Sequence, residues 1–66
     1  MSTVDTRAFL TTLRDDARVR AERMEAQPQY VGYAETAALY RSRQEAYQVA
    51  LNELDVRERA AIKVGA

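Results

Sequence analysis

Apolar side chains recur at helical spacing on both sides of one break in the chain. Residues three and four apart lie on the same face of an α-helix. Before the break the apolar positions are Phe9, Leu10, Leu13, Ala17, Ala21 and Met24. After it they are Tyr33, Ala37, Leu39, Tyr40, Tyr47, Ala50, Leu51, Leu54, Ala61 and Ile62. The pattern therefore predicts two helices, each with one apolar face.

Pro28 and Gly32 punctuate the interior of the chain. Proline disfavours helical geometry in the residue before it, so Pro28 ends the first helix near Gln27. Gly32 is an acceptable N-cap for the second helix, and Ser2 or Thr3 can cap the first. We predict a first helix over residues 4–26, a turn over 27–32 and a second helix over 33–63.

Two alternatives to these boundaries stay open. Pro28 is also suited to the first position of a helix, which would place Gly32 inside the second helix. The segment from Asp55 to Glu58 resembles a capping box, which would break the second helix near Asp55. The lack of glycine or proline in that segment favours a continuous helix.

The second helix carries a heptad seam. Positions 33, 37, 40, 44, 47, 51 and 54 alternate steps of four and three, and Gln44 is the polar member. Such a seam is typical of packing between helices. The short turn directs it against the first helix, so the expected fold class is all-α, an antiparallel two-helix hairpin with coiled-coil-like packing.

A second apolar line lies on the opposite side of the second helix. Its members are Ala38, Val49, Val56 and Ala60. At about 1.5 Å per residue the second helix measures about 45 Å and the first about 35 Å, so the end of the longer helix overhangs. A helix that is apolar on two sides usually contacts two neighbours. We expect self-association into a helical bundle, a dimer in the simplest case, with this line, Arg43 and Gln44 as the candidate interface.

Composition supports that expectation. The chain has 66 residues, 47% of them apolar, and 12 of the apolar residues are alanine. A single domain of this size over residues 1–66 has a marginal core, and small scaffolds usually need disulfides, a metal or a partner subunit. The chain has no cysteine and no histidine, which excludes disulfides and thiolate or imidazole metal sites.

The same inventory leaves little for catalysis. Without histidine, cysteine or a glycine-rich phosphate loop, we expect no enzyme activity, no cofactor and no metal. Ten acidic and ten basic residues cancel, so nucleic acid is an unlikely partner. No stretch is apolar enough to cross a membrane, and the start lacks the features of a signal peptide, so we expect a cytoplasmic protein with no membrane partner.

Tyrosine and arginine supply the one candidate ligand surface. Tyr33, Tyr40 and Tyr47 repeat every seven residues, with Arg41 and Arg43 nearby. Aromatic rings stack on bases and arginine pairs with phosphate, so such a surface suits a nucleotide-like anion. Heptad spacing is more typical of a core seam whose hydroxyl groups reach water, and we favour that interpretation.

Charged residues at helical spacing are expected to form surface ion pairs. Asp16 and Arg20 are four apart, and Arg7, Arg14 and Arg18 share one face of the first helix beside acidic residues. The function we predict is a small non-enzymatic protein–protein interaction module that self-associates and docks on a partner protein. The alternatives are an oligomeric module that binds or sequesters a small anionic ligand and an architectural component of a larger particle such as a virion.

Overall fold

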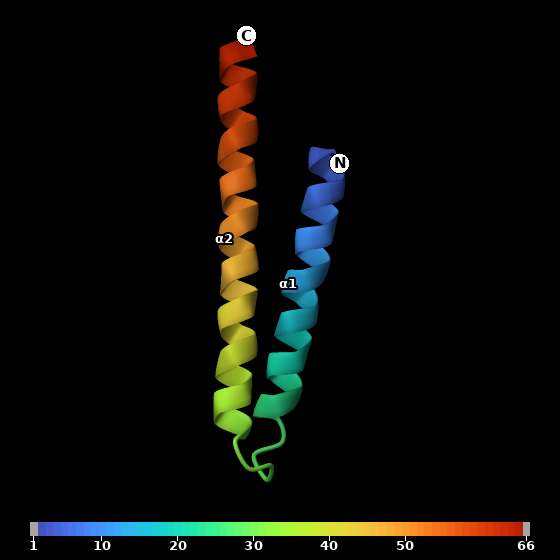
Figure 1. Ribbon diagram of the computed structural model, residues 1–66, viewed down its shortest axis with the longest axis vertical. Coiled ribbons are helices and arrows are strands. Elements are labelled where there is room, and N and C mark those ends of the chain that lie inside the picture. Colours follow the sequence, from blue (N-terminus) through green and yellow to red (C-terminus); the bar gives the residue numbers. More distant parts are fainter. Residues whose placement is uncertain (1, 66) are drawn as a thin grey trace.

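Two antiparallel helices make up the fold (Figure 1). The computed structural model describes residues 2–65, with side chains described as far as Ile62. Helix α1 spans Thr3–Glu25 and helix α2 spans Tyr33–Gly65. The predicted all-α antiparallel hairpin is confirmed.

Ser2 caps the start of α1. Its backbone is extended, with φ −77° and ψ 161°, and its Oγ accepts a hydrogen bond from the Asp5 amide at 3.2 Å. The Thr6 hydroxyl donates to the Ser2 carbonyl oxygen at 3.1 Å. A side-chain oxygen at this position satisfies an amide that has no partner within the helix. Because Ser2 is the cap, α1 begins one residue before the predicted start.

Gly32 sets the beginning of α2. Its φ of +77° lies in the left-handed region, and its carbonyl oxygen accepts the first bond of the helix from the Thr36 amide at 3.0 Å. A Cβ at this position would lie 3.2 Å from the Glu35 Oε2 atom. Glycine adopts this conformation at little cost, since it has no Cβ. The alternative that places Gly32 inside a helix starting at Pro28 is therefore wrong.

Helix α2 continues without a break past Asp55, so the proposed interruption there is also wrong. The Asp55 carboxylate instead reaches across to α1, where its Oδ1 lies 2.6 Å from Arg7 Nη1. At 33 residues against 23, α2 extends well beyond the start of α1 (Figure 1). The predicted overhang is confirmed, and Ile62 within it is 73% exposed.

Small side chains form the centre of the helix contact. Ala17 and Ala21 of α1 and Ala37 and Leu51 of α2 are buried. The separation of packed helices depends on the side chains between them, so alanine allows close approach. Larger apolar residues surround this centre and are half-buried, namely Leu10, Leu13, Met24, Tyr33, Tyr40, Tyr47 and Leu54, and Ala50 is half-buried beside them.

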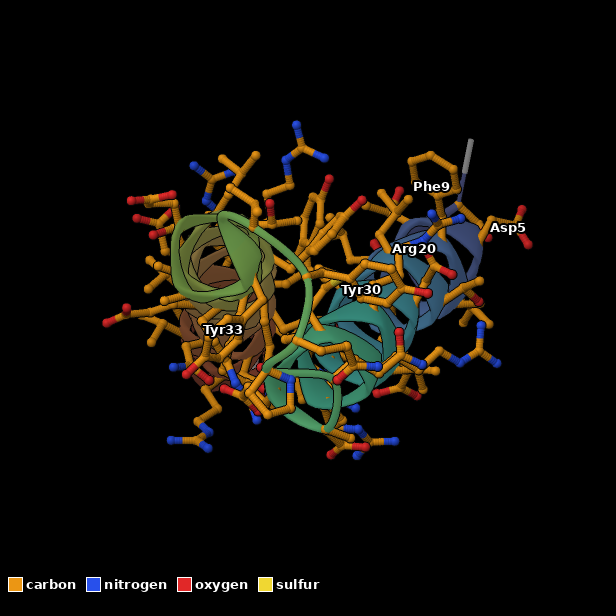
Figure 2. The ribbon with its side chains drawn as sticks, turned by 90° about the horizontal axis from the view of Figure 1, so that it is seen from below. Asp5, Phe9, Arg20, Tyr30 and Tyr33 are labelled. Carbon is orange, nitrogen blue, oxygen red and sulfur yellow. The ribbon has the colours of Figure 1, made fainter. Side chains whose placement is uncertain are left out.

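Besides Ala61 and Ile62 toward the end of α2, two residues expected on the inward faces are largely exposed. Phe9 is 61% exposed and Leu39 is 51% exposed. Each lies next in sequence to an inward-facing residue, Leu10 or Tyr40, and one residue rotates the side chain by about 100° around a helix. A single neighbouring helix covers only the middle of each apolar arc. Seen along the molecule, the Phe9 ring projects outward from α1 (Figure 2).

In the described part of the chain, neither helix combines the length and the apolar character needed to cross a membrane.

Candidate interaction site

Polar bridges between the helices line one flank of the hairpin. Near the turn, Arg41 of α2 forms a bidentate pair with Glu25 of α1, with Nη2–Oε1 at 2.6 Å and Nε–Oε2 at 3.2 Å. Near the free end, Arg7 pairs with Asp55 at 2.6 Å and with Glu58 at 2.8 Å.

Between these two ends, Arg14 Nη1 donates to Gln48 Oε1 at 2.8 Å. The bridging residues recur every seven positions on each helix. They are Arg7 and Arg14 on α1 and Arg41, Gln48 and Asp55 on α2. We call these five residues, with Glu25 and Glu58, the bridged flank.

The contacts of the bridged flank shift the pKa values of the groups that form them, in the direction that favours the charged state. Hydrogen bonds from Arg41 lower the pKa of the Glu25 carboxyl group, and Glu25 in turn raises the pKa of Arg41. The pKa of Arg7 is raised by its hydrogen bonds to Glu58 first and to Asp55 second. The side chains are partly exposed, so each pair stabilises little on its own. Together they orient one helix against the other.

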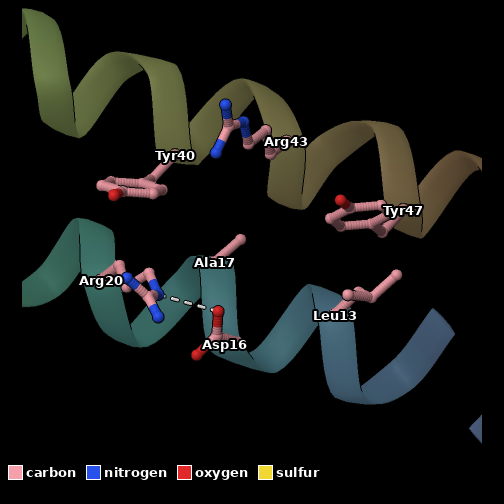
Figure 3. Close-up of a pocket in the computed structure, with 7 residues that line it drawn as sticks. All are labelled: Leu13, Asp16, Ala17, Arg20, Tyr40, Arg43 and Tyr47. Atoms are coloured by element: carbon pink, nitrogen blue, oxygen red, sulfur yellow. Dashed lines mark hydrogen bonds and ion pairs between the residues drawn. The ribbon is translucent and has the colours of Figure 1, made fainter. Parts of the chain in front are cut away.

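The opposite side of the helix contact contains a hollow of about 300 Å³ that opens to solvent (Figure 3). It lies between the two helices at mid-length. The lining residues are Leu13, Asp16, Ala17 and Arg20 of α1 and Tyr40, Arg43 and Tyr47 of α2.

The Tyr40 ring lies within reach of two guanidinium groups. The Arg20 Cζ atom is 6.0 Å and the Arg43 Cζ atom 5.7 Å from the ring centroid, distances at which a cation is attracted to an aromatic ring. Arg20 Nε also donates to Asp16 Oδ2 at 2.9 Å, the predicted pair, and its pKa is raised by Asp16 first and by Tyr40 second. Among the ion pairs of the described residues, none includes Arg43.

A second hollow of about 270 Å³ lies toward the free end, lined by Thr3, Leu54, Arg57, Glu58 and Ala61. One continuous surface connects the two hollows. Its α2 residues are alternately three and four positions apart, and so are the α1 residues opposite them, which places each set on one face of its helix. We call this surface the open flank. It consists of Phe9, Leu13, Asp16 and Arg20 on α1 and Tyr40, Arg43, Tyr47, Ala50, Leu54, Arg57 and Ala61 on α2.

The line Ala38, Val49, Val56 and Ala60 is exposed along its whole length. Val49 is 51% and Val56 62% exposed. Helical spacing places this line on the side of α2 that faces away from α1. We call it the back line.

The candidate ligand residues separate into two groups. Tyr40, Tyr47 and Arg43 line the hollow, whereas Arg41 is held by Glu25 on the bridged flank. Tyr33, the first residue of α2, lies beside the turn and outside the hollow (Figure 2).

Gln44, a candidate interface residue, is half-buried and accepts a hydrogen bond from Arg41 Nη1 at 2.9 Å. Sequence reasoning missed the α1 contribution to the hollow. The spacing of Phe9, Leu13, Asp16 and Arg20 by four, three and four was the available signal.

The expected surface pairing of the α1 arginines is confirmed. Arg7 pairs with Asp55 and Glu58, Arg14 Nη2 lies 3.1 Å from Asp15 Oδ1, and Arg18 Nε lies 4.0 Å from Glu22 Oε1. Among the described side chains, no group of three or more potential metal ligands occurs. No protein-family model, curated protein sequence or solved structure matches this chain.

Proposed function

We propose that the protein is a helical interaction module that associates with itself and docks on a second protein. The observation that carries this proposal is the placement of its large apolar side chains. Phe9 and Val56 are both more than half exposed, and they belong to two separate surfaces, the open flank and the back line. Large apolar side chains exposed along a surface favour an interaction site there.

The extended shape supports the same proposal. The radius of gyration is 15.7 Å, and the molecule measures 56 × 16 × 14 Å. A compact domain of this length has a radius of gyration of about 11 Å. A thin rod leaves each helix with one neighbour only, so much of its apolar surface stays in water. Neighbouring chains would cover that surface.

The back line is the surface we propose for the second protein. It is a narrow strip of alanine and valine along about six turns of α2, with acidic Glu45 and Glu53 beside it. Alanine in such a strip permits close approach of another helix, and valine supplies the apolar contact. The partner chemistry it fits is an amphipathic helix with basic residues along its edges.

Light scattering and intact-mass measurement of the purified protein test the proposal. We expect an assembly larger than one chain at micromolar concentration, and a stably folded monomer that binds no other protein would contradict it. Val49→Asp and Val56→Asp should each abolish the association that uses the back line while far-ultraviolet circular dichroism stays unchanged, because both side chains are exposed within the hairpin. If both variants keep every association of the wild type, the back line is not an interface.

The hollow around Tyr40 favours a second candidate function, the binding of a small anionic ligand. Two guanidinium groups flank one aromatic ring there, an arrangement suited to stacking and phosphate pairing. Titration calorimetry with nucleotides tests it. Arg43→Ala and Tyr40→Ala should abolish the heat of binding, whereas Arg59→Ala, which lies outside the hollow, should not. The absence of any heat for the wild type would exclude this function.

A further inference from the structure

We propose that the open flank binds a second copy of this chain, forming a four-helix bundle in which both turns lie at the same end. This inference rests on the proposed self-association and assigns it a surface and a direction. In this arrangement α1 of each copy packs against α2 of the other, and every neighbouring pair of helices is antiparallel.

The spacing on both helices fits a second neighbour on this side. On α2, positions 40, 47 and 54 belong both to the seam that faces α1 and to the open flank. The open flank adds Ala50 and Ala61, with Arg43 and Arg57 beside them, so the apolar arc of α2 extends past the part that α1 covers. On α1, Phe9 widens the arc on the same side as Leu13. Helices of a bundle have such widened arcs because each contacts two others.

The exposed area of the whole molecule exceeds that of a compact monomer by about the area that one partner buries in a dimer. The chain exposes 5114 Å², whereas a compact monomer of about 7.5 kDa exposes about 4,200 Å². The difference of about 900 Å² is close to the roughly 800 Å² that each partner buries in a stable interface. The bridged flank is the less suitable face, because six of its seven residues are charged, against four of eleven on the open flank, and burying charged side chains costs desolvation free energy.

Charge along the open flank decides which way the second copy runs. On α1 this side has the acids Asp5 and Asp16 together with Arg20, which pairs with Asp16, whereas Arg43 and Arg57 lie on α2. Arg43 lines the same hollow as Asp16. Asp5 lies between Thr3, which lines a hollow with Arg57, and Arg7. Each acid is therefore level with one of these arginines along the molecule.

A twofold axis parallel to the helices places α1 of one copy beside α2 of the other. Because this rotation moves no residue along the axis, each acid stays at the same height as its arginine. Asp16 then meets Arg43 of the second copy, and Asp5 meets Arg57 at the outer edge of the interface. Arg43, which belongs to none of the ion pairs among the described residues of its own chain, gains a carboxylate partner. Complementary charge of this kind sets orientation and excludes other pairings.

The opposite arrangement, with the two turns at opposite ends, places α2 against α2. With the two hairpins fully overlapped, it brings Arg43 of one copy within about one turn of Arg57 of the other. Like charges facing each other in an interface are unfavourable. The same-end arrangement separates Arg43 from Arg57 and sets Arg43 against the Asp16–Arg20 pair of the second copy. It also lays Phe9 against the Ala50 and Leu54 region of the second copy, which covers its exposed ring.

Phe9→Asp tests the surface, and Val49→Asp is its matched control. Both residues are apolar and more than half exposed within the hairpin, one on each surface. We expect Phe9→Asp to raise the dimer dissociation constant, measured by sedimentation, at least tenfold, as for a residue central to an interface. Val49→Asp should leave it unchanged. Dissociation by Val49→Asp with no effect of Phe9→Asp would overturn the open flank as the site and leave self-association standing.

A spin label at Gln29, an exposed turn residue, tests the direction. The chain has no cysteine, so Gln29→Cys carries a single label per chain. Pulsed electron resonance should give a distance between labels of about 20 Å, two interhelical spacings. A distance near the 56 Å length of the molecule would overturn the same-end arrangement. A wild-type protein that stays monomeric overturns this inference and the self-association part of the proposed function together.

Discussion

Arg41 and Arg43 are two residues apart on α2, and their contacts differ completely. Arg41 is bound to Glu25 across the bridged flank, whereas Arg43 lies against the Tyr40 ring on the open flank. Two residues correspond to about 200° around a helix, which turns the two side chains to opposite sides of the helix contact. The sequence places both arginines near the tyrosine repeat and does not separate their roles.

The Arg41–Glu25 pair predicts an acid-sensitive part of the stability. Hydrogen bonds from Arg41 lower the pKa of Glu25 in the folded chain below its ordinary 4.5. The unfolded chain therefore takes up the proton first as pH falls, so this contribution is fully present above the ordinary pKa and is lost as pH falls through the lower folded value. Between about pH 5 and pH 3, the unfolding free energy of the wild type should fall more steeply than that of Glu25→Gln.

Urea denaturation at the two pH values measures this difference, which salt should reduce because the pair is exposed. Glu45→Gln is the control, since Glu45 is exposed and lies away from the helix contact. If the unfolding free energy of the wild type and of Glu25→Gln falls by the same amount between the two pH values, the Arg41–Glu25 pair does not contribute to stability.

At the scale of the elements, the two helices meet through alanine. Ala21 is fully buried, and Ala17 and Ala37 are nearly so, while bulkier residues stand at the edges of the contact. The helix boundaries were largely predictable because they depend on neighbouring residues, such as Ser2 for the start of α1 and Gly32 for the start of α2. The edge positions Phe9 and Leu39 were not, because their exposure depends on how far around each helix the other one reaches.

Ala21→Leu should destabilise the hairpin by about 1–3 kcal/mol, because a larger side chain at the point of closest approach forces the helices apart. Urea denaturation followed by circular dichroism measures the change. Ala8→Leu is the matched control on the same helix, where an exposed position should change stability by no more than about 0.5 kcal/mol. Ala21→Leu and Ala8→Leu with equal stability would show that the helices are not held at close distance there.

At the scale of the whole molecule, the hairpin is a rod with a bridged flank held by ion pairs, an open flank of mixed apolar and charged residues, and an apolar back line. Its buried centre consists of three alanines and one leucine, which is little for a chain of 66 residues. Buried apolar area is the main favourable contribution to folding. We therefore expect much of the stability to come from contacts between chains.

That expectation predicts an unfolding midpoint that depends on protein concentration. For a chain that unfolds from a dimer, each tenfold rise in concentration stabilises the folded dimer by about 1.4 kcal/mol. Urea midpoints measured from about 1 to 100 µM should rise accordingly, and those of Phe9→Asp should stay nearly constant. A wild-type midpoint that does not move over this range would contradict stability derived from association.

The amino-acid sequence by itself determined two helices, the turn between them and the heptad seam that joins them. Local spacing, a proline and a glycine are enough for this, because helix geometry and turn conformation depend on residues close together in the chain. The tertiary structure decided which side chains from different helices meet. Arg20 reaches the Tyr40 ring, Arg41 pairs with Glu25, and Phe9 stays outside. These contacts depend on the rotation and register of one helix against the other, which the packing of Ala17, Ala21, Ala37 and Leu51 sets and which no spacing within a single helix encodes.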